Sequence, residues 1–330
     1  MEKKKLAIII PTCNRLGCIR YYLETQLERF REYGVDVILY DSSDDDGVLN
    51  CADTFCRSGF QNLIYKRYEE AGNVRAIDDK VFSACRELHG QYEYIWFSSD
   101  GTVFQIDSIW PSVSRGMEQG RDLLVLNHAH SSNIADRTYT DSRALLQDCG
   151  WILTMLGTGI VSARLIRETV ERFPVTSRTD FWLWYPLAYF YTLAGRPVDA
   201  VWLGCQTPYR ENPFRTDAFW KLNGDALWQW GKVWVESIEA LPAFYDDVKA
   251  GVIRSWDAHT RLFSIKGLMG MRAQGQITHS DVVRYRAYIK KITDTKAVWF
   301  YIITLPGART LLSWVRRMYR AIQKKGRERQ

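Results

Sequence analysis

Continuous apolar runs alternate with amphipathic stretches through much of the chain. A run such as 6–10 (LAIII) is typical of a strand buried on both faces of a parallel sheet, and 92–97 (YEYIWF) has the aromatic content of a strand. The same pattern predicts further strands at 35–40, 62–67, 123–126 and 198–203, and helices at 16–33, 73–88, 164–173 and 181–193. This alternation predicts an α/β fold with a mostly parallel sheet flanked by helices.

Two later regions break the alternation. The segment 131–148 is polar and predicts a loop with a short helix, whereas 151–161 is apolar. From about residue 216 helical periodicity dominates and strand signals fade, and Pro208 and Pro213 precede that change. We therefore expect a sheet domain at 1–215 and a mainly helical region at 216–330.

The composition indicates which cell compartment and which binding partners to expect for this protein. The seven cysteines are odd in number and lack metal-binding spacing, which predicts reduced thiols in a cytosolic protein. No segment has the roughly 20 consecutive apolar residues needed to span a bilayer. The net charge of +6 is concentrated at the C-terminus, where an anionic membrane suits it. Nucleic acid is not expected, because the basic cluster is confined to the tail and no recognition motif accompanies it.

Acids follow the predicted strands. Asp100 lies in SSDG (98–101) after the strand 92–97, Asp41 ends the strand 35–40, and Asp180 stands at a helix start. The carboxyl ends of strands in a doubly wound sheet share one edge, so the three acids could meet in one crevice. They suit a divalent cation, with one acid kept apart as a base. Each also has a structural interpretation, as a turn former, a turn cap or a helix N-cap.

Several of these segments resemble family 2 glycosyltransferases, which have the GT-A fold. IIIPTCNR at 8–15 resembles the first strand and loop of that family, and Asp41 resembles its nucleotide-base site. The helix start 73–75 (NVR), the strand and loop 94–101 (YIWFSSDG) and the acidic motif 178–182 (RTDFW) resemble later motifs in matching order. The resemblance implies nucleotide-sugar contacts from Pro11, Thr12, Asn14, Arg15, Asp41, Arg75, Ser99 and Asp100. Arg75 alternatively forms only a surface pair.

The acidic motif departs from the family pattern, because it carries one acid where two or three are usual. If SSD (98–100) is the motif, Asp100 is its last acid and the metal ligand. If DGT (100–102) is the motif, Thr102 takes the metal position and Asp100 faces the sugar or ribose. Either register leaves less negative charge for the Mn²⁺ or Mg²⁺ that the resemblance implies at Asp100. Weak metal binding, a borrowed ligand and no metal at all remain open.

The resemblance implies an inverting glycosyltransferase of the hexosyltransferase type with a nucleotide-sugar donor, which we predict to be UDP-linked. In the single displacement that the resemblance implies, Asp180 would take the proton from an acceptor hydroxyl as that oxygen attacks the anomeric carbon. A cation at Asp100, or positive groups such as Arg210 and Arg215, stabilises the leaving nucleoside diphosphate. The expected acceptor is a hydroxyl of a glycan or of a lipid-linked acceptor in the synthesis of cell-surface polysaccharide.

The C-terminal segment favours a membrane surface. AVWFYIITL at 297–305 is strongly apolar but too short to span a bilayer. Beyond it, apolar side chains fall on one helical face and basic ones on the other, which is typical of an interfacial helix. We expect peripheral contact through 297–330 at the cytoplasmic face of the cell membrane. The alternative is a solvated helix docked on the protein itself.

Two rival functions are compatible with these patterns. A nucleotidyltransferase with a similar sheet is expected to have a Gly-rich basic loop after the first strand, where PTCNRLG offers one glycine and one arginine. A non-catalytic scaffold could retain the fold and lose the metal site, and the missing acids favour that alternative.

Overall fold

The computed structural model describes residues 4–68, 76–128, 135–173, 184–207, 209–215 and 226–310. The chain divides into two compact units. The first holds Met1–Thr216 with Leu241–Tyr245, and the second holds Asp217–Ala240 with Asp246–Gln330.

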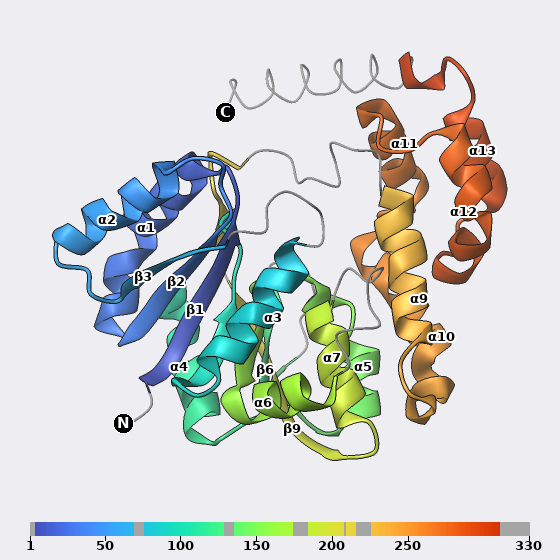
Figure 1. The fold of residues 1–330 in the computed structure, drawn as a ribbon. Helices are drawn as coiled ribbons and strands as arrows, with labels where there is room; N and C mark the ends of the chain where they lie inside the picture. Colours follow the sequence, from blue (N-terminus) through green and yellow to red (C-terminus); the bar gives the residue numbers. More distant parts are fainter. Residues whose placement is uncertain are drawn as a thin grey trace. The chain divides into compact units, whose positions relative to one another are not determined.

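The first unit is built on an eight-stranded sheet with the strand order β3-β2-β1-β4-β8-β6-β9-β7 (Figure 1). Its strands are β1 Lys4–Thr12, β2 Val35–Asp41, β3 Leu63–Arg67, β4 Tyr92–Phe97, β6 Leu123–His128, β7 Arg137–Asp141, β8 Gly159–Ser162 and β9 Pro197–Thr207. Neighbouring strands are parallel except where β8 joins β4 and β6 and where β7 joins β9. The predicted α/β fold with a mostly parallel sheet is confirmed.

Helices cover both faces of this sheet (Figure 1). One face packs against α1 Leu16–Glu32, α2 Gly47–Arg57 and α4 Ile106–Glu118. The other packs against α3 Ala76–Leu88, α6 Ala163–Arg172 and α7 Trp184–Leu193, with α5 Ser142–Cys149 beside β7 and β9. Two short 3₁₀ turns, η1 Ile152–Thr154 and η4 Ala243–Tyr245, complete the unit.

The central strand β1 explains why the sheet is buried on both sides. Leu6, Ile8 and Ile10 belong to the core shared with α1, while Ala7 and Ile9, which alternate with them, are also fully buried. A strand of alternating side chains needs apolar residues at every position when both of its faces are covered. The apolar run at 6–10 therefore correctly indicated a strand in the middle of the sheet.

The second unit is helical, as the fading strand signals beyond 216 predicted. Its described elements are the π-helical turn η3 Trp228–Val233, α9 Trp234–Glu239, α10 Asp246–Thr260, α11 Ile265–Gln274, α12 His279–Ile292 and α13 Ala297–Thr304. Thr278 and Asp281 form a reciprocal capping box at the start of α12. None of the described helices is long and apolar enough to cross a membrane.

The expectation for 131–148 was wrong in part. The structure has a strand, β7, at Arg137–Asp141 before the short helix α5. Among its residues Tyr139 is buried and the others are exposed, because β7 is the edge strand of the sheet. An edge strand with one buried side chain lacks the apolar signal on which the prediction relied.

A second small sheet brings two distant segments together. The strand β5, Thr102–Phe104, pairs antiparallel with β10, Tyr209–Glu211, so that Thr102 faces Glu211 in the register. Because β5 begins two residues after Asp100, this pairing brings the segment 209–215 to the loop that carries Asp100.

Candidate functional site

The predicted site loops follow three parallel strands that lie side by side. Thr12 ends β1, Asp41 ends β2, and Asp100 lies in the loop after β4. Strand β1 has β2 on one side and β4 on the other, so the strand order reverses at β1. Ligands of open α/β sheets bind beyond the carboxyl ends of the strands at such a reversal. The topology therefore brings these polar residues to the edge where a ligand is expected.

Asp100 is the centre of the most charged part of the site. Its side chain is buried, at 2% exposure, and both carboxylate oxygens accept hydrogen bonds. Thr12 donates from Oγ1 to Oδ2 at 2.9 Å, and Arg15 donates from Nη1 to Oδ1 at 2.6 Å. Burial raises the pKa of the Asp100 carboxyl. The charge of Arg15 and the Thr12 hydrogen bond oppose that rise in pKa.

Lys80 is a buried cation at the same place, and the sequence analysis missed it. It lies on α3 and is 2% exposed, and its Nζ donates to the main-chain oxygen of Thr12 at 2.6 Å. Burial lowers the pKa of the Lys80 ammonium. Interactions with Cys13, Asp41 and Asp100 oppose that shift, so the carboxylates that follow β2 and β4 act on one ammonium.

Asp41 is fully buried in a tight turn. Its Oδ1 accepts from the main-chain nitrogen and the hydroxyl of Ser43, at 2.9 and 2.5 Å, and its Oδ2 accepts from the Tyr65 hydroxyl at 3.0 Å. The Arg67 guanidinium lies 3.6 Å from Oδ2 and donates to the Tyr65 hydroxyl. Asp41 therefore caps the turn after β2, as its structural interpretation expected, and its contact with a nucleotide base stays a prediction.

Asn14 connects the loop after β1 to the loop after β2. Its main-chain nitrogen donates to Ser43 Oγ at 2.8 Å, and its side chain exchanges two hydrogen bonds with Asp44. Its φ of 55° lies in the left-handed region, which asparagine tolerates better than most residues. Pro11, the neighbour of Thr12, pairs with Tyr40 within the sheet. These contacts hold Arg15 at the start of α1, directly beyond the ends of the strands.

The segment 209–215 supplies two residues to the site. Asn212 was not indicated by any local pattern, whereas Arg215 is one of the cations that the sequence analysis named. Asn212 is buried, and its Nδ2 donates to the main-chain oxygens of Asp100, at 3.0 Å, and Cys18, at 2.8 Å. Arg215 crosses the loop at Gly101, where an added Cβ would lie 3.1 Å from the Arg215 Cδ. Its charge acts on Asp100 in the same direction as those of Arg15 and Lys80.

Four other predicted positions have different outcomes. Asp180 and Arg75 lie outside the described residues, so the catalytic base and one nucleotide contact stay predictions. Ser99 accepts a hydrogen bond on its hydroxyl from the Gly101 nitrogen at 3.1 Å, which is a turn contact. Thr102, the metal position of the second register, is buried in β5.

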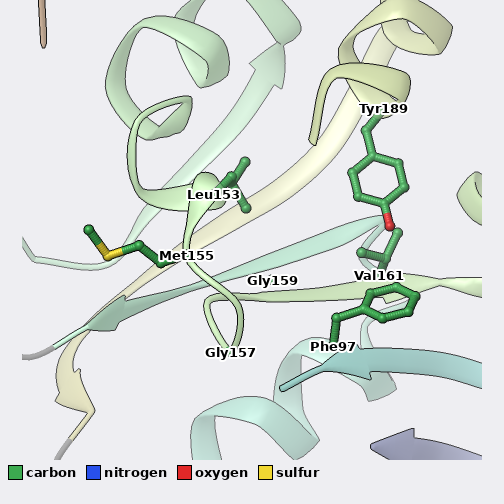
Figure 2. Close-up of a pocket in the computed structure, with 7 residues that line it drawn as sticks. All are labelled: Phe97, Leu153, Met155, Gly157, Gly159, Val161 and Tyr189. Atoms are coloured by element: carbon green, nitrogen blue, oxygen red, sulfur yellow. The ribbon is translucent and has the colours of Figure 1, made fainter. Parts of the chain in front are cut away.

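An apolar pocket lies beside the end of β4 (Figure 2). It is lined by Phe97, Leu153, Met155, Gly157, Gly159, Val161 and Tyr189. Figure 2 shows the Tyr189 side chain extending toward Val161 and Phe97. Gly157 has a φ of +101°, and a Cβ there would lie 2.4 Å from the Phe104 ring, so the turn requires glycine. Because the lining carries no charged side chain, we assign this pocket to the core rather than to the acidic site.

No protein-family model and no curated protein sequence matches the chain. Among solved structures, S. aureus TarS 1-349 superposes with a TM-score of 0.54 at 14% identity, covering 91% of this chain and 90% of that one. Its complex with UDP-GlcNAc gives a TM-score of 0.53 at 16% identity, covering 99% and 92%. The mannosyltransferase PcManGT from Pyrobaculum calidifontis, in complex with GDP-Man and Mn²⁺, gives 0.50 at 12% identity, covering 95% and 84%. This architecture is the GT-A fold, which confirms the fold prediction.

Proposed function

We propose that the chain is an inverting glycosyltransferase that moves a hexose from a UDP-linked sugar to a hydroxyl of a glycan or lipid-linked acceptor. The observation that carries the proposal is the convergence of Thr12, Arg15, Lys80 and Asp100 beyond the carboxyl ends of the parallel strands. A concentration of buried polar and charged groups at this edge suits an anionic ligand. The GT-A architecture and the nucleotide-sugar complexes of its structural neighbours support that choice of ligand.

The proposed reaction is a single displacement. The acceptor oxygen forms a bond to the anomeric carbon as the bond from that carbon to the diphosphate oxygen breaks, so the configuration inverts. Asp180 accepts the proton of the acceptor hydroxyl, and the nucleoside diphosphate leaves with the bonding electron pair. Asp41 stands on the nucleoside side of the site in this proposal.

Release of UDP from a panel of UDP-sugars, with an extract of lipid-linked glycans as acceptor, tests the activity directly. We expect Asp180→Asn to lower the transfer rate at least about 100-fold and to leave UDP affinity unchanged. Asp53→Asn, at an exposed acid of α2, is the matched control and should keep the wild-type rate. A near-normal rate for Asp180→Asn would remove that residue from the role of base.

The single acid in 98–102 favours one rival, a scaffold that kept the fold without turnover. Asp100→Ala separates the two proposals. In an enzyme this change lowers turnover, because Arg15 and Thr12 lose the group that orients them. A scaffold keeps its partner binding and its role in the cell after the same change.

We also propose that the second unit contacts a membrane surface through α13. This helix buries Phe300 and Ile303 and exposes three large apolar side chains, Val298, Trp299 and Ile302, and Leu305 directly after it is exposed as well. In the sequence a strongly basic segment follows at 311–330. An exposed apolar face next to basic residues is the arrangement that binds anionic lipid surfaces.

Co-sedimentation with phosphatidylglycerol vesicles tests this contact. Ile302→Glu should weaken vesicle binding about tenfold, since it puts a charge where an apolar side chain enters the lipid. Ala287→Glu adds the same charge at an exposed position of α12 and should leave binding unchanged. The proposal fails if deletion of 307–330 leaves co-sedimentation at the wild-type level.

A further inference from the structure

The residues around Asp100 do not fit a divalent cation well. Mg²⁺ and Mn²⁺ need several oxygen ligands, and carboxylates normally provide the charge. Here both Asp100 oxygens are already engaged, one by the Thr12 hydroxyl and one by the Arg15 guanidinium. Within the described part of the chain, no group of three or more His, Cys, Asp or Glu side chains is arranged to hold a metal ion.

The surroundings of Asp100 are instead positively charged. Three cations, those of Arg15, Lys80 and Arg215, act on this one carboxylate. Like charges repel strongly in a partly buried site, so these cations disfavour a further dication beside Asp100. The same charges favour a diphosphate, which carries negative charge on several oxygens.

We infer that this site holds the nucleoside diphosphate of its donor through Arg15 and Lys80, without a divalent cation. The inference rests on the proposed function, because it concerns the donor of that reaction. It makes Asp100 a positioning residue, which orients the Arg15 guanidinium and holds the Thr12 hydroxyl.

Arg15 has the donors that such a role requires. Its side chain is 27% exposed, and one terminal nitrogen is bound to Asp100. Its Nε, which is buried, finds no hydrogen-bond acceptor among the described residues. A guanidinium offers five N–H groups in a rigid fork that matches phosphate oxygens. Asp100 fixes one side of this fork and leaves the others for a ligand.

Lys80 is placed on the apolar face of a helix, where a cation is costly. Its neighbours on α3, Val81 and Ala84, are fully buried, yet Lys80 shares their face and points its ammonium to the end of β1. An ammonium has three donors, and the Thr12 main-chain oxygen takes one of them. Burying lysine is unfavourable, and the charges of Asp41 and Asp100 offset that cost only in part, since the Lys80 pKa remains lowered. A bound diphosphate would add charged acceptors for the remaining donors.

Calorimetric titration of the full-length protein with UDP, and separately with GDP, tests the inference. In excess EDTA we expect wild-type protein to bind UDP or GDP, with a Kd that added Mn²⁺ changes by less than about threefold. Lys80→Met and Arg15→Met should each weaken this binding at least about tenfold. Arg57→Met, at an exposed arginine of α2, is the matched control and should bind as wild type does.

Asp100→Asn sharpens the test, because a metal site and a metal-free site predict different changes in nucleotide affinity for this variant. A metal ligand converted to an amide loses nucleotide affinity. In a metal-free site the Asn oxygen still accepts from Arg15 and keeps it in position, and the loss of the negative charge leaves the nucleotide affinity equal or higher. Thermal melts identify any variant that fails to fold, and Arg15→Lys then replaces Arg15→Met, with the expectation of weaker binding than wild type.

The outcomes separate the inference from the proposed function. Nucleotide binding that EDTA weakens by tenfold or more, or that Asp100→Asn abolishes, overturns the metal-free site and leaves the proposed transferase standing. No binding of UDP or GDP under either condition overturns both. Binding that is insensitive to EDTA but lost in Lys80→Met supports the inference.

Discussion

Two carboxylates of the same sheet edge have different surroundings. Asp41 and Asp100 each follow a buried parallel strand, and their exposures are 0% and 2%. The hydrogen bonds to Asp41 come from neutral groups, Ser43 and Tyr65, with a half-exposed guanidinium 3.6 Å away. Asp100 instead shares its site with a directly bonded arginine and a buried lysine. Burial alone therefore does not distinguish an acid that shapes a turn from one that interacts with cations. The hydrogen-bond donors distinguish them, since those of Asp41 are neutral and Asp100 is bonded to an arginine.

The largest expected effect comes from removing the charge at Asp100. Asp100→Ala leaves Arg15 and Lys80 without their carboxylate, and an uncompensated buried charge costs about 3 kcal/mol of unfolding free energy. Urea unfolding measures that loss. Inorganic phosphate should restore part of the stability of this variant, because an anion can take the place of the missing carboxylate.

The wild-type protein is the control for the phosphate effect. Its Asp100 carboxylate already faces the cations, so phosphate should stabilise it less than it stabilises Asp100→Ala. Equal stabilisation of the two proteins would mean that phosphate binds elsewhere and that Asp100 does not balance these cations.

Removing Asp41 should have a somewhat smaller effect of another kind. Asp41→Ala leaves the Ser43 nitrogen and the Tyr65 hydroxyl without their acceptor in a buried turn, at a cost of about 2 kcal/mol. Phosphate should not rescue this variant, because the groups left behind are neutral and Arg67 is already in contact with water. Recovery in phosphate comparable to that of Asp100→Ala would erase the distinction between the two acids.

The sequence indicated the acids of this site and the Asp100 partners Thr12 and Arg15, but not Lys80 or Asn212. Apolar runs mark buried strands reliably, so the polar residues that end them, Thr12, Asp41 and Asp100, could be predicted to share an edge. Lys80 had a detectable signal, since a charged residue among Val81 and Ala84 on a helix face must have a buried partner. That partner, the main-chain oxygen of Thr12, is 68 residues away, and no local pattern connects the two.

Asn212 had no such signal. Its bond to the main-chain oxygen of Asp100 spans 112 residues and depends on the pairing of β5 with β10. Both strands have three residues, too short for a periodic pattern to be read. The helix α2 was missed for a related reason, because the acidic turn formers Asp44–Asp46 precede it immediately and its first residue is a glycine.

A finer change isolates the neutral hydrogen bond at Asp41. Tyr65→Phe removes the hydroxyl that donates to Asp41 Oδ2 and keeps the ring, so we expect a loss of about 1 kcal/mol in unfolding free energy. Urea unfolding at neutral pH measures it. The loss should disappear in the Asp41→Ala background, since the hydroxyl there has no carboxylate to bind. If the losses of unfolding free energy in the two single variants simply add in the double variant, Tyr65 and Asp41 do not interact directly.

The smallest expected effect concerns a buried carboxylate in the helical unit, Asp257. Its Oδ1 accepts from the Phe263 nitrogen at 2.7 Å, and burial raises its pKa while the Thr293 hydrogen bond lowers it. A carboxyl whose pKa is raised by folding is protonated in both states at low pH, where it costs no stability. The cost begins as pH rises above the unfolded-state pKa and is complete above the folded-state pKa. Asp257→Asn keeps an acceptor for Phe263 without the charge. Its melting temperature should therefore be similar to that of wild type at about pH 3, below the unfolded-state pKa, and exceed it at pH 7. Asp257→Ala loses the acceptor for Phe263 and should be less stable than wild type at both pH values. If Asp257→Asn is instead less stable than wild type at pH 7, the ionised carboxylate is favourable there. A more stable Asn variant at pH 7 would show that the ionised Asp257 carboxylate is unfavourable there, unlike Asp100, which is bonded to Arg15.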